Sequence, residues 1–140
     1  MINDGLKLTG ALTIALNDEV VQETKNLVVT AGKNWVADRM NDANTVMTHM
    51  AVGTGTTEAL VTQTALVTEN DRNALTSTTV TANAIAYVAT WAAGDATAAI
   101  TEAGIFLLDN NTTMINANTL NTIDFSAADS MTITWTITVS

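Results

Sequence analysis

The residues from Met131 to Ser140 alternate strictly between apolar and polar side chains. Every second residue from Met131 to Val139 is apolar, and each residue between them is a threonine. A period of two places alternate side chains on opposite faces of a β-strand. Threonine is β-branched and suits a pleated, half-solvated surface. The pattern therefore predicts a strand over this segment, with its apolar side facing a core.

Other stretches with the same period, separated by turns rich in Asn, Asp and Gly, predict further strands. Gly10 predicts a bulge or bend in the first of them. Residues Glu58–Asn73 show no clean period, and we interpret them as a docked loop or a single helical turn. Besides Met131–Ser140, the predicted strands are Leu6–Leu16, Glu19–Thr30, Thr45–Val52, Ala74–Thr81, Ala84–Trp91, Thr97–Leu108 and Thr113–Leu120.

One short helix is predicted over Ala31–Asn41, because Thr30 can cap its start and its large side chains, including Trp35, fall on one side. One helix and roughly eight evenly spaced strands predict a mainly β fold, an antiparallel β-sandwich or flattened barrel. The chain shows no linker and no repeat, so we expect residues 1–140 to form a single domain. The predicted core includes Leu12, Ile14, Val28, Trp35, Ile133, Trp135 and Ile137.

Composition narrows the range of partners. The formal net charge is -9 and only 5 residues are Lys or Arg, which argues against a nucleic-acid partner. Hydrophobic residues make up 47% of the chain and charged residues 14%, so we expect part of the surface to lie against another subunit. The apolar stretch Ala84–Ala93 is too short to span a bilayer, and Met1–Gly5 does not read as a signal peptide. We therefore expect synthesis in the cytoplasm and no membrane partner.

The candidates for catalysis or phosphate binding lack the neighbours that such chemistry needs. His49 is the only histidine, and neither a Ser with an orienting acid nor further metal ligands lie near it in sequence. We interpret it as a strand or interface residue. Gly53–Thr57 resembles a phosphate loop, but the required Lys is absent and Glu58 follows. A tight, glycine-dependent connection is the simpler interpretation.

The acidic candidates also favour structural roles. Asn17–Glu19 and Asp109–Asn111 offer oxygen ligands but match no calcium loop, and turn chemistry explains both. Glu69 and Asp71 are interpreted as part of a solvated loop with an ion pair. Glu102 has apolar neighbours, so we expect its carboxylate to contact a backbone amide or an Arg side chain. The sequence thus predicts no enzyme, no metal and no cofactor.

The three tryptophans, Trp35, Trp91 and Trp135, are interpreted as core or interface anchors. An aromatic platform for a host-surface glycan, built on Trp91 and Tyr87, remains an alternative.

Five segments taken in order resemble a family of small virion structural proteins of tailed bacteriophages. Similar segments occur in short standalone phage structural proteins and in the N-terminal attachment modules of tail-fibre or collar proteins. The family has no known catalytic residues. Leu107–Asp109 departs from its pattern, because many relatives carry a polar, Asn-containing turn there. The five segments are Asn26–Lys33, Met50–Thr57, Thr64–Leu66, Ile100–Phe106 and Ile133–Ile137.

The resemblance implies a component of the virion, assembled in the host cytoplasm. The preferred role is a capsid decoration (cement) protein that stabilises the head surface, and the alternative is a tail, collar or fibre-adaptor protein. We expect a homo-oligomer, with a trimer preferred, that binds the major capsid protein or tail components. The expected contacts are the Thr-rich strands and the N-terminal residues Met1, Ile2, Asn3, Asp4 and Gly5.

Overall fold

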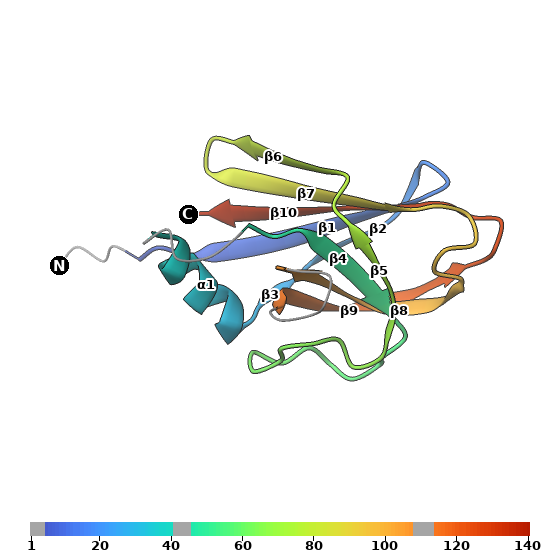
Figure 1. Ribbon diagram of the computed structural model, residues 1–140, viewed down its shortest axis with the longest axis horizontal. Helices are drawn as coiled ribbons and strands as arrows, with labels where there is room; N and C mark the ends of the chain where they lie inside the picture. The colour runs from blue at the N-terminus through green and yellow to red at the C-terminus, as the bar shows by residue number, and fades with distance from the viewer. Residues whose placement is uncertain (1–4, 41–45, 108–113) are drawn as a thin grey trace.

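Two antiparallel five-stranded sheets face each other in the computed structural model, which describes residues 5–40, 46–107 and 114–140 (Figure 1). Sheet A has the strand order β2-β1-β10-β7-β6, and sheet B has the order β3-β9-β8-β4-β5. The elements are β1 (Leu8–Leu16), β2 (Glu19–Lys25), β3 (Leu27–Val28), α1 (Thr30–Met40), β4 (His49–Gly53), β5 (Glu69–Ala74), β6 (Ser77–Thr81), β7 (Ala84–Trp91), β8 (Ala98–Phe106), β9 (Met114–Phe125) and β10 (Met131–Val139). The predicted mainly antiparallel β fold with one short helix is confirmed, and two separate sheets make it a sandwich.

The strictly alternating segment forms β10, the central strand of sheet A. Its neighbours are β1 and β7, which place Leu12 and Tyr87 on either side of Trp135. Period two carries through the register, so the apolar side of β10 faces sheet B and its threonines face outward. Side chains of β4, β8 and β9 complete the core from sheet B.

Five of the seven residues predicted for the core are buried, and two are half-buried. Val28 lies in the two-residue strand β3 at the edge of sheet B, and its neighbour Val29 is the fully buried residue. Trp35 is on α1, which covers one end of the sandwich (Figure 1), and it packs half-buried against the core. The five buried residues are Leu12, Ile14, Ile133, Trp135 and Ile137.

The predicted strand Glu19–Thr30 is wrong as one element, because the chain changes sheets at Asn26. Residues before it form β2 in sheet A, and Leu27–Val28 pairs with β9 in sheet B. Gly10 allows this crossing, since a Cβ there would meet Asn26 Oδ1 at 1.7 Å. Gly10 itself lies in unbroken register opposite Ile137, so the bulge predicted there is wrong.

The segment Glu58–Asn73 contains an unpredicted strand. Its last part belongs to β5, which pairs with β4 at the edge of sheet B, with His49 opposite Ala74. Both faces of β5 carry polar side chains, and an edge strand with solvent on one side lacks the apolar alternation that would mark it in sequence. The number of strands is therefore ten among the described residues, instead of roughly eight.

The turns follow the predictions where the structure describes them. Asn17 and Asp18 have φ values of 51° and 65°, the left-handed conformation that Asn and Asp tolerate. Ala82 has a φ of 53° in the turn between β6 and β7. The predicted turn Asp109–Asn111 and the predicted last residue of the helix, Asn41, lie outside the described residues.

The Trp135→Ala substitution should lower the free energy of unfolding by about 3–5 kcal/mol, because the indole is 0% exposed and its removal leaves a cavity between the sheets. Urea-induced unfolding would measure the loss. Thr136→Ala on the outer face of the same strand is the matched control and should change stability by less than about 0.5 kcal/mol. Equal effects of the two substitutions would contradict the assignment of faces.

Asp129 joins two turns at the end of the sandwich away from α1. Its carboxylate accepts hydrogen bonds from Asn17 Nδ2 at 2.8 Å and from the Ser126 amide and hydroxyl at 3.1 and 2.8 Å. Asn17 Oδ1 in turn accepts a bond from the Ser130 amide at 2.9 Å. These donors, led by the Asn17 side chain, hold the pKa of Asp129 below its ordinary value of 3.8.

We expect acid to remove the stabilisation from Asp129. A carboxylate whose folded pKa is lowered stabilises the fold above its unfolded pKa, near 3.8, and loses that contribution as the pH falls through the folded pKa. Unfolding of wild type and Asp129→Asn should therefore differ at neutral pH and converge in acid, once the pH has fallen below the lowered pKa of Asp129. A difference that persists unchanged in acid would contradict this role for the ionised carboxylate.

Candidate functional site

Glu102 is a buried acid whose contacts are backbone amides. It lies on β8 and is 3% exposed. Its Oε1 accepts hydrogen bonds from the amides of Gly55 at 2.9 Å and Thr68 at 2.7 Å, and its Oε2 accepts one from Val67 at 2.9 Å. Of the two contacts predicted for Glu102, amide or Arg, the structure has the amide. The carboxylate holds both ends of the loop 54–68 against sheet B.

The glycines of the Gly53–Thr57 segment make room for this carboxylate. A Cβ on Gly53 would lie 2.6 Å from Glu102 Oε1 and 2.3 Å from the carbonyl oxygen of Thr68. A Cβ on Gly55 would also lie 2.6 Å from Oε1. The Gly55 amide thus donates to a carboxylate of the same chain. The connection depends on its glycines because a Cβ at either position would clash with that carboxylate. The Thr101 hydroxyl donates to the Gly55 carbonyl oxygen at 2.8 Å.

Four of the five segments from which we inferred a resemblance to phage virion proteins meet on this outer side of sheet B. Each contributes a buried residue to a second apolar cluster or a group to the Glu102 contacts. The cluster is small and separate from the core between the sheets, and Met114 completes it. Together these segments form a framework that holds a loop. Their cluster residues are Val29, Ala51, Leu66 and Phe106.

His49 and the acids of β5 also have structural surroundings. His49 is half-buried on β4, and its Nδ1 lies 2.7 Å from the Thr48 hydroxyl, which donates to the Leu107 carbonyl oxygen. Arg72 binds Glu69 through two nitrogens, at 2.5 and 3.1 Å, and its guanidinium lies 3.8 Å from the centre of the Phe106 ring. The predicted ion pair is confirmed, but it lies on a strand and not in a loop.

Within residues 5–40, 46–107 and 114–140, no group of three or more His, Cys, Asp or Glu side chains could hold a metal ion. None of the helices in that part of the chain is long and apolar enough to cross a membrane. Trp91 is 0% and Tyr87 3% exposed, so neither can present a flat ring to a sugar. The residues chosen for a glycan platform are thus unavailable at the surface.

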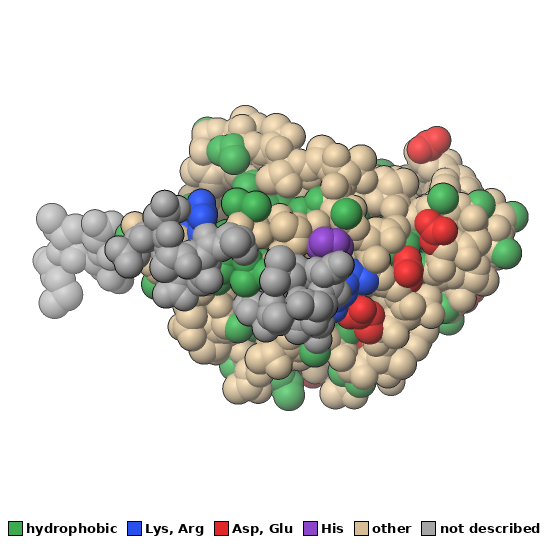
Figure 2. Space-filling model, in the orientation of Figure 1, with side chains coloured by type: hydrophobic (Ala, Val, Ile, Leu, Met, Phe, Trp, Pro, Cys, Tyr) green, Lys and Arg blue, Asp and Glu red, His purple; other side chains and the backbone are tan. Residues whose placement is uncertain are grey.

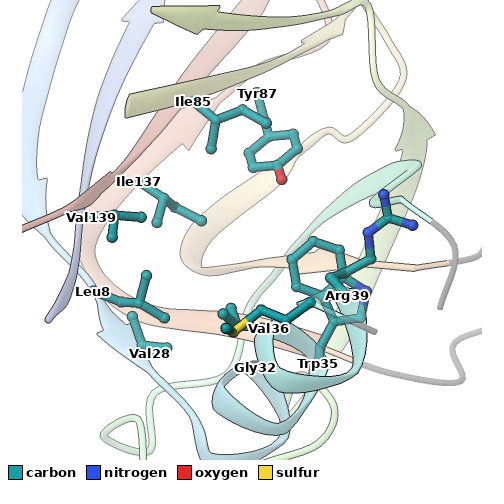
Figure 3. Close-up of a pocket in the computed structure, with 11 residues that line it drawn as sticks. Leu8, Val28, Gly32, Trp35, Val36, Arg39, Ile85, Tyr87, Ile137 and Val139 are labelled. Carbon is teal, nitrogen blue, oxygen red and sulfur yellow. The ribbon is translucent and has the colours of Figure 1, made fainter. Parts of the chain in front are cut away.

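An apolar groove of about 430 Å³ lies between α1 and the inner face of sheet A, at the end of the sandwich that the helix covers (Figure 3). Leu8, Ile85, Ile137 and Val139 line it from sheet A. From the opposite side it is lined by Val28, Gly32, Trp35, Val36, Arg39 and Met40. The sequence predicted a one-sided helix, but no local pattern indicated that a gap would remain beneath it.

Two polar groups reach this groove. Tyr87 extends from β7 with its hydroxyl directed into the space beneath the helix (Figure 3), and it makes no hydrogen bond with a described residue. Burial raises the pKa of the Tyr87 hydroxyl, and the positive charge of Arg39 on α1 opposes that rise in part. The phenol therefore stays protonated and remains a hydrogen-bond donor at neutral pH.

A charge-free surface covers most of sheet A. Strands β1, β6, β7 and β10 contain no Asp, Glu, Lys or Arg. Every residue of the edge strand β6 is exposed, including Val80 at 69%. The acidic side chains visible in Figure 2 lie in the half of the molecule away from α1. The outer side of these four strands is thus a broad neutral face, and β6 forms one edge of sheet A.

The predicted N-terminal contact segment is described only at Gly5, which is exposed, because Met1, Ile2, Asn3 and Asp4 lie outside the described residues. Just after it, the backbone of Lys7 exchanges hydrogen bonds of 2.6 and 2.9 Å with Ser140. The chain therefore enters sheet A beside the end of β10, next to the groove.

Comparison of the chain with known protein families, with curated proteins and with solved structures finds no match.

Replacing Glu102 tests its structural role. Glu102→Ala leaves three amides without an acceptor and should lower the free energy of unfolding by at least about 3 kcal/mol. Glu102→Gln keeps one acceptor oxygen but turns an NH₂ group toward an amide donor, so we expect an intermediate loss of about 2 kcal/mol. Urea unfolding and amide hydrogen exchange at Gly55, Val67 and Thr68 would measure both effects.

The matched control is Glu69→Gln, which removes a carboxylate whose side chain is 35% exposed and should cost less than about 1 kcal/mol. If Glu102→Ala were as mild as this control, the loop would not depend on Glu102.

Proposed function

We propose that the protein is a non-enzymatic structural component of a tailed-phage virion that decorates the outside of the capsid. The observation that carries this proposal is the charge-free face of sheet A in a chain of net charge -9. The five resembling segments support the virion assignment, and the structural use of Glu102 and of the Gly53–Thr57 segment supports a role without catalysis.

The charge-free face suits permanent contact with protein. Burying an ion without a partner is costly, and the cores of protein interfaces are depleted in charged residues. Copies of an anionic chain also repel one another wherever their charged surfaces meet. Strands β1, β6, β7 and β10 allow close approach without either cost. The outward threonines of β10 can still form hydrogen bonds across such a contact.

The edge strand β6 supports self-association. Natural sheets protect their edges with Lys, Pro, bulges or covering segments, whereas Ser77–Thr81 is uncharged, free of Pro and exposed throughout. Such an edge accepts a strand from another chain. We propose a homo-oligomer, with a trimer as the preferred state, that forms on the capsid lattice.

Decoration would stabilise the head by mass action. A protein that binds the assembled lattice and not the free capsid subunits adds its binding free energy to the intact shell. Many copies at modest individual affinity suffice for this. The charged residues outside the neutral face would then give the particle an acidic exterior, which disfavours adhesion to other polyanions.

Copy number tests the location. Quantitative mass spectrometry of purified virions should find hundreds of copies per particle if the protein covers the capsid. A dozen copies or fewer would overturn decoration and assign the protein to the tail, collar or fibre attachment.

A charge placed on the neutral face tests the contact itself. Thr134→Asp on the outer side of β10 should weaken association with undecorated capsids by more than about tenfold, because an unpaired charge would be buried. Val20→Asp adds the same charge on β2, which already carries Glu19 and Glu23, and should bind like wild type. Cosedimentation would measure both. Equal binding of the two variants would exclude this face as the contact.

A further inference from the structure

The groove beneath α1 has the size and lining of a small-molecule site. Its volume of about 430 Å³ falls within the range of roughly 300–1,000 Å³ that is typical of ligand pockets. Aliphatic side chains line it from sheet A, and Trp35 and Val36 line it from the helix. An alkyl chain in this space would be shielded from water on two sides.

Tyr87 gives the groove a specific polar group. The side chain is 3% exposed, and its hydroxyl projects into the groove (Figure 3). Buried phenol hydroxyls are usually hydrogen-bonded, but none of the described residues bonds to this one. A ligand atom that accepts a hydrogen bond would satisfy it.

Arg39 determines the charge of that ligand atom. It lines the same groove, and its guanidinium lies close enough to act electrostatically on the Tyr87 hydroxyl. Arg39 has a further interaction within the chain, but a guanidinium carries five N–H donors and can bond a ligand atom as well. The protonated phenol of Tyr87 also donates. The complementary group is an anionic acceptor, and a carboxylate fits a planar guanidinium best. The rest of the ligand must be apolar to match the walls.

We propose that the groove binds the alkyl chain of a medium-chain fatty acid, whose carboxylate accepts hydrogen bonds from Tyr87 and Arg39. The site is separate from the neutral outer face of sheet A, because β7 and β10 contribute their opposite, inner faces to it. The proposal is therefore independent of the role on the virion.

Titration with decanoate, and with decanol as the uncharged partner compound, tests the site in the wild-type protein. Calorimetry measures affinity, and the fluorescence of Trp35 reports binding in the groove. Decanoate should bind at least about tenfold more tightly than decanol, since hydrogen bonds to a charged group are the stronger ones.

Three variants locate the binding. Tyr87→Phe and Arg39→Gln should each weaken decanoate about tenfold and leave decanol unchanged. Val139→Trp should fill the groove with the larger side chain and abolish binding of both compounds. We expect the fold to tolerate this substitution because Val139 is 37% exposed. Arg72→Gln is the control for Arg39→Gln, because it removes the same charge on β5, outside the groove lining.

Tyr87→Phe also distinguishes a ligand contact from a structural one. Without ligand, this variant should melt at the same temperature as wild type or higher, since it removes a buried hydroxyl that makes no hydrogen bond with a described residue. A lower melting temperature would show a structural hydrogen bond and overturn the assigned role of Tyr87. Equal affinities for decanoate and decanol would overturn carboxylate recognition. Absence of binding, or binding that survives Val139→Trp, would overturn the site.

Discussion

The loop side of sheet B depends on one buried carboxylate. Glu102 accepts three backbone hydrogen bonds from residues that lie 34 to 47 positions away in the chain. A carboxylate is the best acceptor for several converging amides, and burying it is tolerable only because those amides are present. Gly53 and Gly55 are glycines because a Cβ would occupy the same space. The second apolar cluster, around Phe106, forms beneath the loop that this arrangement holds.

Charged residues are distributed unevenly over the molecule. Charged residues lie on β2, α1, β5, β8, β9 and the loops, whereas four strands of sheet A carry none. Their outer face is neutral and suited to a protein contact. Their inner face is core along most of its length, but near α1 it lines the groove that contains Tyr87. If both proposals hold, the two faces of the same strands supply two different binding surfaces.

The local sequence pattern predicted elements that have core on one side and solvent on the other. Strand β10 was predicted because one of its sides is apolar and the other polar, which is the signal that periodicity carries. Strand β5 carries polar side chains on both faces and therefore lacks this signal, so it was missed. A strand that changes sheets keeps its extended pattern, so β2 and β3 were predicted as one. Gly10 was misinterpreted because the structure needs glycine there for another reason: a Cβ would clash with the side chain of Asn26, which lies between β2 and β3. No local sequence pattern shows this close approach.

By itself the sequence determined the fold class, most of the core and the absence of familiar catalytic motifs, because these follow from local alternation and from residue types. It also indicated that Glu102 needs a polar contact. Only the tertiary structure decided which amides supply it, that the neutral strands lie side by side in one sheet, and that Tyr87 and Arg39 reach one groove. Each of these depends on strand order and on the position of α1. Strand order and helix placement result from contacts between residues far apart in the chain, which a periodic pattern does not encode.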